Sequence, residues 1–65
     1  MNALNEAARE ALEVVERTKR PDNGLYCLMS AILANPRVAA DLRKRASAQL
    51  DRIEGQRYPH APKYA

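Results

Sequence analysis

Apolar and polar residues follow the period of an α-helix through the first third of the chain. Apolar positions recur there at spacings of three and four, which predicts an amphipathic helix. Pro21 prevents the helix from continuing, so we expect it over residues 3–19. Glu16 stands four residues before Arg20, the favourable order for an ion pair along one helix. The expected buried stripe consists of Leu4, Ala8, Ala11, Leu12 and Val15, widened by Ala7, Val14 and Thr18.

The next segment, Leu25 to Ala34, reads LYCLMSAILA, and Ser30 is its one polar side chain. Turn residues precede it and Pro36 follows it, so we expect a second helix over residues 24–34. A helix that is apolar on every side must be covered on every side. The rest of the chain has few large apolar residues, which favours a homodimer over the alternative, a monomeric three-helix bundle. The expected dimer interface consists of Leu25, Tyr26, Leu28, Met29, Ile32 and Leu33.

A third helix is expected over residues 36–54. Asn35 followed by Pro36 is a strong start signal, and Gly55 is a typical stop signal. No segment shows the alternation of a β-strand, so the sequence predicts an all-α chain of three helices. The inward stripe of the third helix consists of Val38, Leu42, Ala46, Gln49, Leu50 and Ile53.

The composition changes after Gly55. The last ten residues, QRYPHAPKYA, contain two prolines and no helical periodicity. They predict a single helical domain over residues 1–55 and an extended or disordered tail over residues 56–65. Tyr58 directly precedes Pro59, and Tyr64 follows Pro62 by two residues, so the tail is either a second binding element or an end without a role.

Charge and cysteine content narrow the class of protein. The formal net charge of +3 is small, and acidic residues are interspersed among the basic ones. A single cysteine allows no internal disulfide and fits a reducing compartment, and no secretion signal is visible. The apolar run is about half the length needed to span a bilayer, roughly 20 residues. We therefore expect a cytoplasmic protein that is not inserted in a membrane.

Candidate catalytic chemistry is sparse. Cys27 and His60 are the only nucleophile–base candidates, and Cys27 lies in the apolar run, where a buried and inert thiol is expected. One cysteine and one histidine do not make a metal site, and no glycine-rich phosphate loop is present. The sequence therefore predicts no enzyme, no cofactor and no metal.

Protein binding is the function that the pattern favours. We expect a small adaptor or inhibitor of the kind carried by phages, plasmids or regulatory operons, docking as a homodimer on a larger protein. Arginine makes bidentate pairs with carboxylates and is common at interfaces, which suggests an acidic partner. The expected partner-binding residues are Arg37, Lys44, Arg45, Arg52, Tyr58 and Tyr64.

Two alternatives remain open. The basic third helix could neutralise phosphates in a small DNA-binding regulator, and the corner at Asn35–Pro36 superficially resembles a helix-turn-helix unit. Asp41 and Asp51 dilute that positive face, and the corner lacks a glycine. The other alternative is a structural subunit of a larger assembly.

Overall fold

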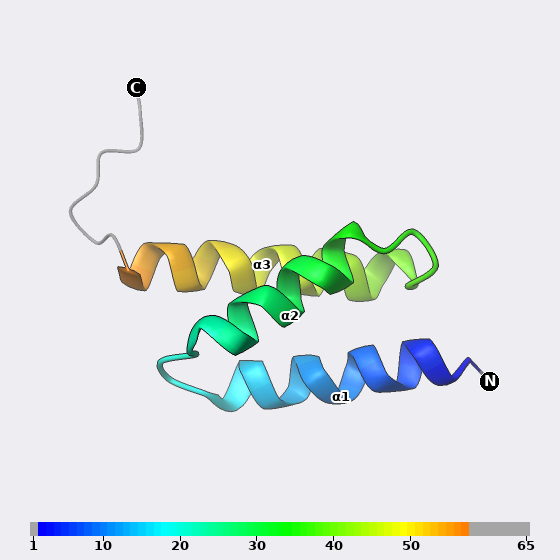
Figure 1. The fold of residues 1–65 in the computed structure, drawn as a ribbon, viewed down its shortest axis with the longest axis horizontal. Coiled ribbons are helices and arrows are strands. Elements are labelled where there is room, and N and C mark those ends of the chain that lie inside the picture. The colour runs from blue at the N-terminus through cyan, green and yellow to red at the C-terminus, as the bar shows by residue number, and fades with distance from the viewer. Residues whose placement is uncertain (1, 58–65) are drawn as a thin grey trace, which may run out of the picture.

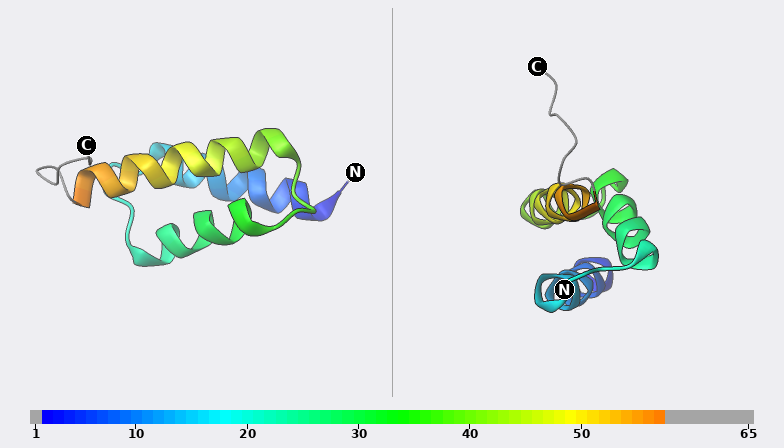
Figure 2. Two further views of the ribbon diagram at one scale, coloured as in Figure 1. Left: turned by 90° about the horizontal axis from the view of Figure 1, so that it is seen from above. Right: turned by 90° about the vertical axis from the view of Figure 1, so that its left-hand side faces the viewer.

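The computed structural model describes residues 2–57, which form three α-helices and no strand. Helix α1 spans Ala3–Arg17, α2 spans Asn23–Ala34 and α3 spans Ala40–Arg57. Helices α1 and α3 run in the same direction, and α2 runs back in the opposite direction (Figure 1). Seen along their axes, the three helices form a triangle with α2 to one side of the α1–α3 pair (Figure 2). The predicted all-α fold with three helices is confirmed over these residues.

Helix α1 begins as predicted and ends two residues earlier than predicted. The Asn2 side chain caps it by accepting a hydrogen bond from the backbone N–H of Leu4 at 2.9 Å. Thr18 leaves the helix with an extended backbone, φ −88° and ψ 124°. Its hydroxyl donates to the Val14 carbonyl at 2.7 Å, which satisfies a carbonyl that the ending helix leaves open.

Helix α2 carries the apolar run. Asp22 caps it by accepting a hydrogen bond from the backbone N–H of Leu25 at 3.0 Å. The helix ends at Ala34, as predicted.

The predicted start of the third helix at residue 36 is wrong, because α3 begins at Ala40. Asn35 caps a turn instead of a helix: its side chain accepts from the backbone N–H of Arg37 at 2.9 Å. The N–H of Val38 donates to the Asn35 carbonyl at 3.1 Å and closes this turn. The turn brings Val38 into the core, where its side chain is buried.

Helix α3 receives its N-terminal contact from another helix. The Asn5 side chain, on α1, accepts a hydrogen bond from the backbone N–H of Ala39 at 2.9 Å. This hydrogen bond joins residues 34 positions apart in sequence, so no local sequence pattern predicts it.

The C-terminal end of α3 also differs from the prediction. Gly55 does not stop the helix, and Gln56 and Arg57, assigned to the tail, form its last turn. Gln56 donates from Nε2 to the Lys19 carbonyl at 2.9 Å, and Arg57 donates to Oδ1 of Asn23 at 2.6 Å. These tertiary contacts stabilise helical turns beyond a residue of low helix propensity. The rest of the predicted tail, residues 58–65, lies outside the described residues.

The hydrophobic core draws on all three helices. The stripe predicted for the third helix lies inward, as does that of the first helix except for Ala7 and Val14, which are exposed. Helix α2 contributes Met29 and Ile32. One face of the apolar run is therefore covered by α1 and α3 of the same chain. The buried residues of this core are Ala8, Leu12, Val15, Met29, Ile32, Val38, Leu42, Ala46, Leu50 and Ile53. None of the helices within residues 2–57 is long and apolar enough to cross a membrane.

Candidate functional site

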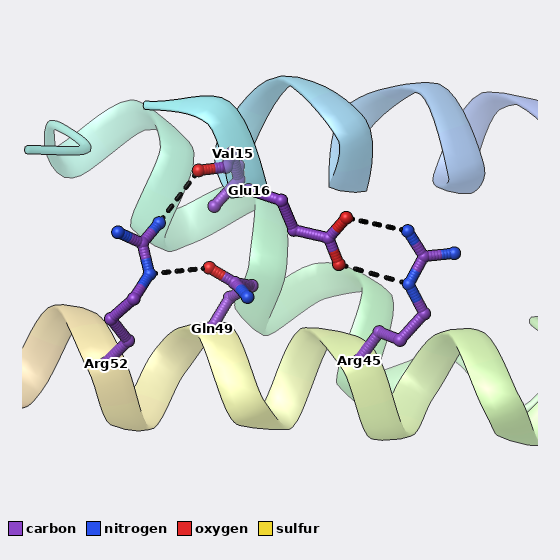
Figure 3. A network of polar contacts seen from close by, with 5 residues as sticks. All are labelled: Val15, Glu16, Arg45, Gln49 and Arg52. Atoms are coloured by element: carbon purple, nitrogen blue, oxygen red, sulfur yellow. Dashed lines mark hydrogen bonds and ion pairs between the residues drawn. The ribbon is translucent and has the colours of Figure 1, made fainter. Parts of the chain in front are cut away.

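Arg45, one of the predicted partner-binding residues, pairs with a carboxylate of its own chain. Its Nη2 lies 2.8 Å from Oε1 of Glu16, and its Nε lies 3.1 Å from Oε2 (Figure 3). The bidentate pair joins α3 to α1. Glu16 was expected to pair with Arg20, but α1 ends before Arg20, which therefore cannot form the i,i+4 pair.

This pair shifts both ionisation equilibria. The hydrogen bond from Arg45 lowers the pKa of Glu16 below its ordinary value, against a smaller opposing effect of burial. The charges of Arg45 and Arg52 add to the lowering. The hydrogen bond to Glu16 correspondingly raises the pKa of Arg45. Both side chains are about one-third exposed, at 37% and 34%, so solvent screens the pair and its stabilisation is modest.

Arg52, also predicted to bind a partner, closes the C-terminal end of α1. Its Nη2 donates to the Val15 carbonyl at 2.8 Å, and its Nε donates to Oε1 of Gln49 at 2.8 Å (Figure 3). A cation at this position satisfies a terminal carbonyl and interacts favourably with the helix dipole. Arg45 and Arg52 are thus held within the bundle.

Tyr26, predicted to lie in a dimer interface, connects α2 with the end of α3. Its hydroxyl donates to Oε2 of Glu54 at 2.8 Å. The guanidinium carbon of Arg57 lies 4.7 Å from the centre of its ring, in a cation–π arrangement. The half-buried tyrosine therefore takes part in the packing of a single chain.

The other predicted interface residues lie in three different environments. Met29 and Ile32 are buried in the core, at 0% and 6% exposure, and Leu25 is half-buried against it. Leu28 and Leu33 are exposed, at 41% and 39%, and line different depressions of the surface. The structure therefore does not bring the six residues together on one exposed face, and Met29 and Ile32 need no second chain to cover them.

The first depression, called here the basic hollow, lies where α2 and α3 meet. Leu33 supplies apolar surface, and Lys44 is exposed at the rim. Arg43 keeps its Nε bonded to the Val38 carbonyl at 3.1 Å. Arg37 is exposed in the connection between α2 and α3. The basic hollow is lined by Leu33, Ala40, Asp41, Arg43, Lys44 and Ser47.

The second depression, called here the apolar groove, lies between α1 and α2 and has a volume of about 190 Å³. Alanines on both helices keep it open, and Leu28 stands at its edge. Val14, which is 45% exposed, lies two helical turns beyond Ala7 on the same edge of α1. The groove is lined on α1 by Leu4, Ala7, Ala8 and Ala11, and on the other side by Leu28, Ala31, Ile32, Asn35 and Val38.

Sequence reasoning missed this groove because it placed Ala7 and Val14 on the margin of a single buried stripe. The signal was present: residues 4, 7, 11, 14 and 18 alternate in spacing between three and four, which is the repeat of a helix-packing seam. Because the buried stripe is centred on Ala8, Leu12 and Val15, this seam is rotated toward solvent.

The reactive side chains do not form a constellation within the described residues. Cys27 is exposed, so the expectation of a buried thiol is wrong: residue 27 lies on the side of α2 away from Met29 and Ile32. Residues 2–57 contain no group of three or more His, Cys, Asp or Glu side chains that could hold a metal ion. The predicted binding residues Tyr58 and Tyr64, and the candidate base His60, lie outside the described residues.

The arrangement of α2 and α3 bears on the helix-turn-helix resemblance. The two helices lie alongside each other in opposite directions (Figure 1), whereas the helices of that unit cross at about 90–120°. The connection, residues 35–39, is a capped turn rather than a sharp corner.

Taken together, the described residues define a small three-helix bundle with a basic hollow on one side of α2 and an apolar groove on the other. Comparison of the chain with protein-family models, with curated proteins and with solved structures gave no match.

Proposed function

We propose that this protein is a small, non-catalytic protein-binding module, an adaptor or inhibitor, that docks on an acidic segment of a larger protein. The exposed Leu33 within the basic hollow is the observation that carries the proposal. Protein interfaces usually have an apolar centre, which loses its water on binding, and a polar rim. Leu33 supplies the apolar centre here, and the neighbouring cations, which can pair with carboxylates, supply the rim. The module acts as a homodimer.

The charges around Leu33 favour an acidic partner over a neutral one. The side chains of Lys44 and Arg37 are exposed, and neither forms a hydrogen bond or ion pair within residues 2–57, so both can pair with carboxylates at no cost to the bundle. Arg45 and Arg52, which the sequence had grouped with them, are occupied within the bundle. The proposed contact set is therefore Leu33, Arg37 and Lys44. The lone thiol fits a reducing compartment such as the cytoplasm.

Affinity capture from an extract of the source cells tests the proposal. The full chain and the variant R37E/K44E are immobilised side by side, and the captured proteins are identified by mass spectrometry. We expect one protein to be retained by the wild type and lost with R37E/K44E, because reversed charges repel an acidic segment. The matched control is K19E, which reverses an exposed lysine at the other end of the bundle; it should retain that protein.

Three outcomes contradict the proposal. Equal capture by the wild type and R37E/K44E would remove the basic hollow as the docking surface. A shift of duplex DNA, with affinity that falls steeply as salt rises, would favour the DNA-binding regulator instead. A chain that is insoluble unless it is produced together with a neighbouring protein would favour the structural subunit.

A further inference from the structure

The apolar groove raises the question of what covers it. Val14 and Leu28 are the most exposed large apolar side chains of residues 2–57, and they stand on the two helices that border the groove. Helix α2 has no charged residue between Asn23 and Ala34, so its wall of the groove offers only apolar or small side chains. A partner that fills the groove must therefore present a narrow apolar face. A helix rich in alanine has such a face.

Helix α1 itself has such a face. Its outer seam, residues 4, 7, 11, 14 and 18, has the alternating spacing of three and four at which two helices pack side by side. Ala7 and Ala11 are small, so another helix axis can approach closely. The seam that borders the groove on one molecule therefore has the shape needed to enter the groove of another.

The charges beside this seam are self-complementary. Glu10 and Arg17 lie two helical turns apart on the same edge of α1, next to the outer seam. Both are exposed, and neither side chain forms a hydrogen bond or ion pair with another residue among 2–57. When two copies of α1 pack in opposite directions, with Ala11 of one opposite Val14 of the other, Glu10 of each copy lies beside Arg17 of the other. The two-fold axis repeats the pairing, as an isologous interface requires.

The same register also covers the exposed leucine. Ala11 and Leu28 line the groove together, on opposite walls. A Val14 side chain placed opposite Ala11 therefore lies against Leu28 as well. By symmetry, each copy covers Val14 of the other with its own Leu28.

We infer that the occupant of the apolar groove is α1 of a second copy of this chain, packed antiparallel, with Val14 against Leu28 and Glu10 beside Arg17 across the two-fold axis. This inference rests on the proposed function, since it assigns the face through which the module forms its homodimer. Of the interface residues expected from sequence it retains Leu28 and Ile32, which both line the groove. The basic hollow lies on the other side of α2 and stays open in this dimer.

A charge swap tests the inference on the purified full chain. Sedimentation equilibrium from micromolar to millimolar concentration should give twice the mass of one chain at the upper end for the wild type. E10R and R17E should each weaken the dimer by roughly tenfold, because each places like charges across the axis. The double variant E10R/R17E restores opposite charges and should return the dissociation constant to near the wild-type value. Failure of the double variant to recover the dimer would overturn this pairing.

A second pair of variants tests the apolar contact. V14E places a charge in the proposed interface and should abolish the dimer, whereas L33E places one on the other side of α2 and should leave it intact. Both side chains are exposed, so neither change disturbs the core, and circular dichroism would verify the helix content. A wild-type monomer at every concentration, or equal weakening by V14E and L33E, would overturn the inference. Capture of the partner by the V14E monomer would leave the basic hollow standing as the docking surface, so failure of the dimer and failure of the docking surface are distinguishable.

Discussion

Arg45 of α3 and Glu16 of α1 are joined by two parallel hydrogen bonds, of 2.8 and 3.1 Å, between residues 29 positions apart in sequence. The pair fixes which side of α1 faces α3. Arg52, one helical turn after Gln49, donates to the Val15 carbonyl of α1 and to the Gln49 side chain. Arg45 and Arg52 therefore both connect α3 to α1 along one edge of the bundle. Of the four basic residues expected to bind a partner, the structure assigns two to this internal role.

The Glu16–Arg45 pair should make a measurable but small contribution to stability. In a double-mutant cycle with E16Q and R45Q, we expect a coupling energy of about 0.5–1 kcal/mol, because partly exposed ion pairs are screened by water. Urea denaturation followed by circular dichroism would measure it. D51N, which neutralises an exposed carboxylate on α3, is the control and should leave the unfolding free energy almost unchanged. Zero coupling would show that the two side chains do not act together in solution.

The pH dependence of that contribution follows from the lowered pKa of Glu16. The unfolded chain binds the proton near the ordinary value of 4.5, and the folded chain binds it only at lower pH. The contribution is therefore fully present above pH 4.5 and is lost as the pH falls through the lowered value. The difference in unfolding free energy between wild type and E16Q should shrink below pH 4.5. A side-chain carboxyl titration by NMR that placed Glu16 at or above its ordinary pKa would contradict this.

Arg52 should matter more for stability than the exposed Lys44. R52M removes the donor to the Val15 carbonyl and should lower the unfolding free energy by about 1.5–3 kcal/mol, the range for hydrogen bonds that involve a charged group. K44M likewise replaces a long cationic side chain with a neutral unbranched one. It should alter the unfolding free energy by less than about 0.5 kcal/mol. Thermal denaturation of both variants would compare them. Equal losses would mean that the capping contact is not formed.

Asn5 should be needed for the start of α3. N5A removes the acceptor for the Ala39 N–H and should cost about 1 kcal/mol, as the loss of a helix cap does. N5D keeps an acceptor there and adds a negative charge near a helix N-terminus, so it should be as stable as the wild type. Urea denaturation of the two variants gives the comparison. If N5A matched N5D, the cross-helix bond would have no energetic role.

The apolar run should divide into a core face and a surface face. M29A removes a fully buried side chain and should cost about 2–5 kcal/mol, enough to unfold much of a domain this small. L33A removes a side chain that is 39% exposed and should cost markedly less. Hydrogen exchange by NMR would show the effect even where M29A is largely unfolded. Similar losses from both variants would contradict the assigned faces.

Local sequence patterns by themselves determined the all-α class, the three helices and most of the buried positions. These depend on helical periodicity and on capping, which act over a few residues and are visible in sequence. The tertiary structure alone decided three further points. Asn5 and the turn at Asn35 moved the start of α3, contacts with Lys19 and Asn23 extended its end past Gly55, and Glu16 paired with Arg45 rather than with its own helix. Apart from the turn at Asn35, which is local, each depends on residues distant in sequence that meet only after the helices pack, so no local pattern could predict it. The same packing separated Met29 and Ile32 from Leu28 and Leu33, because a helix apolar all round can bury only the face that its neighbours cover.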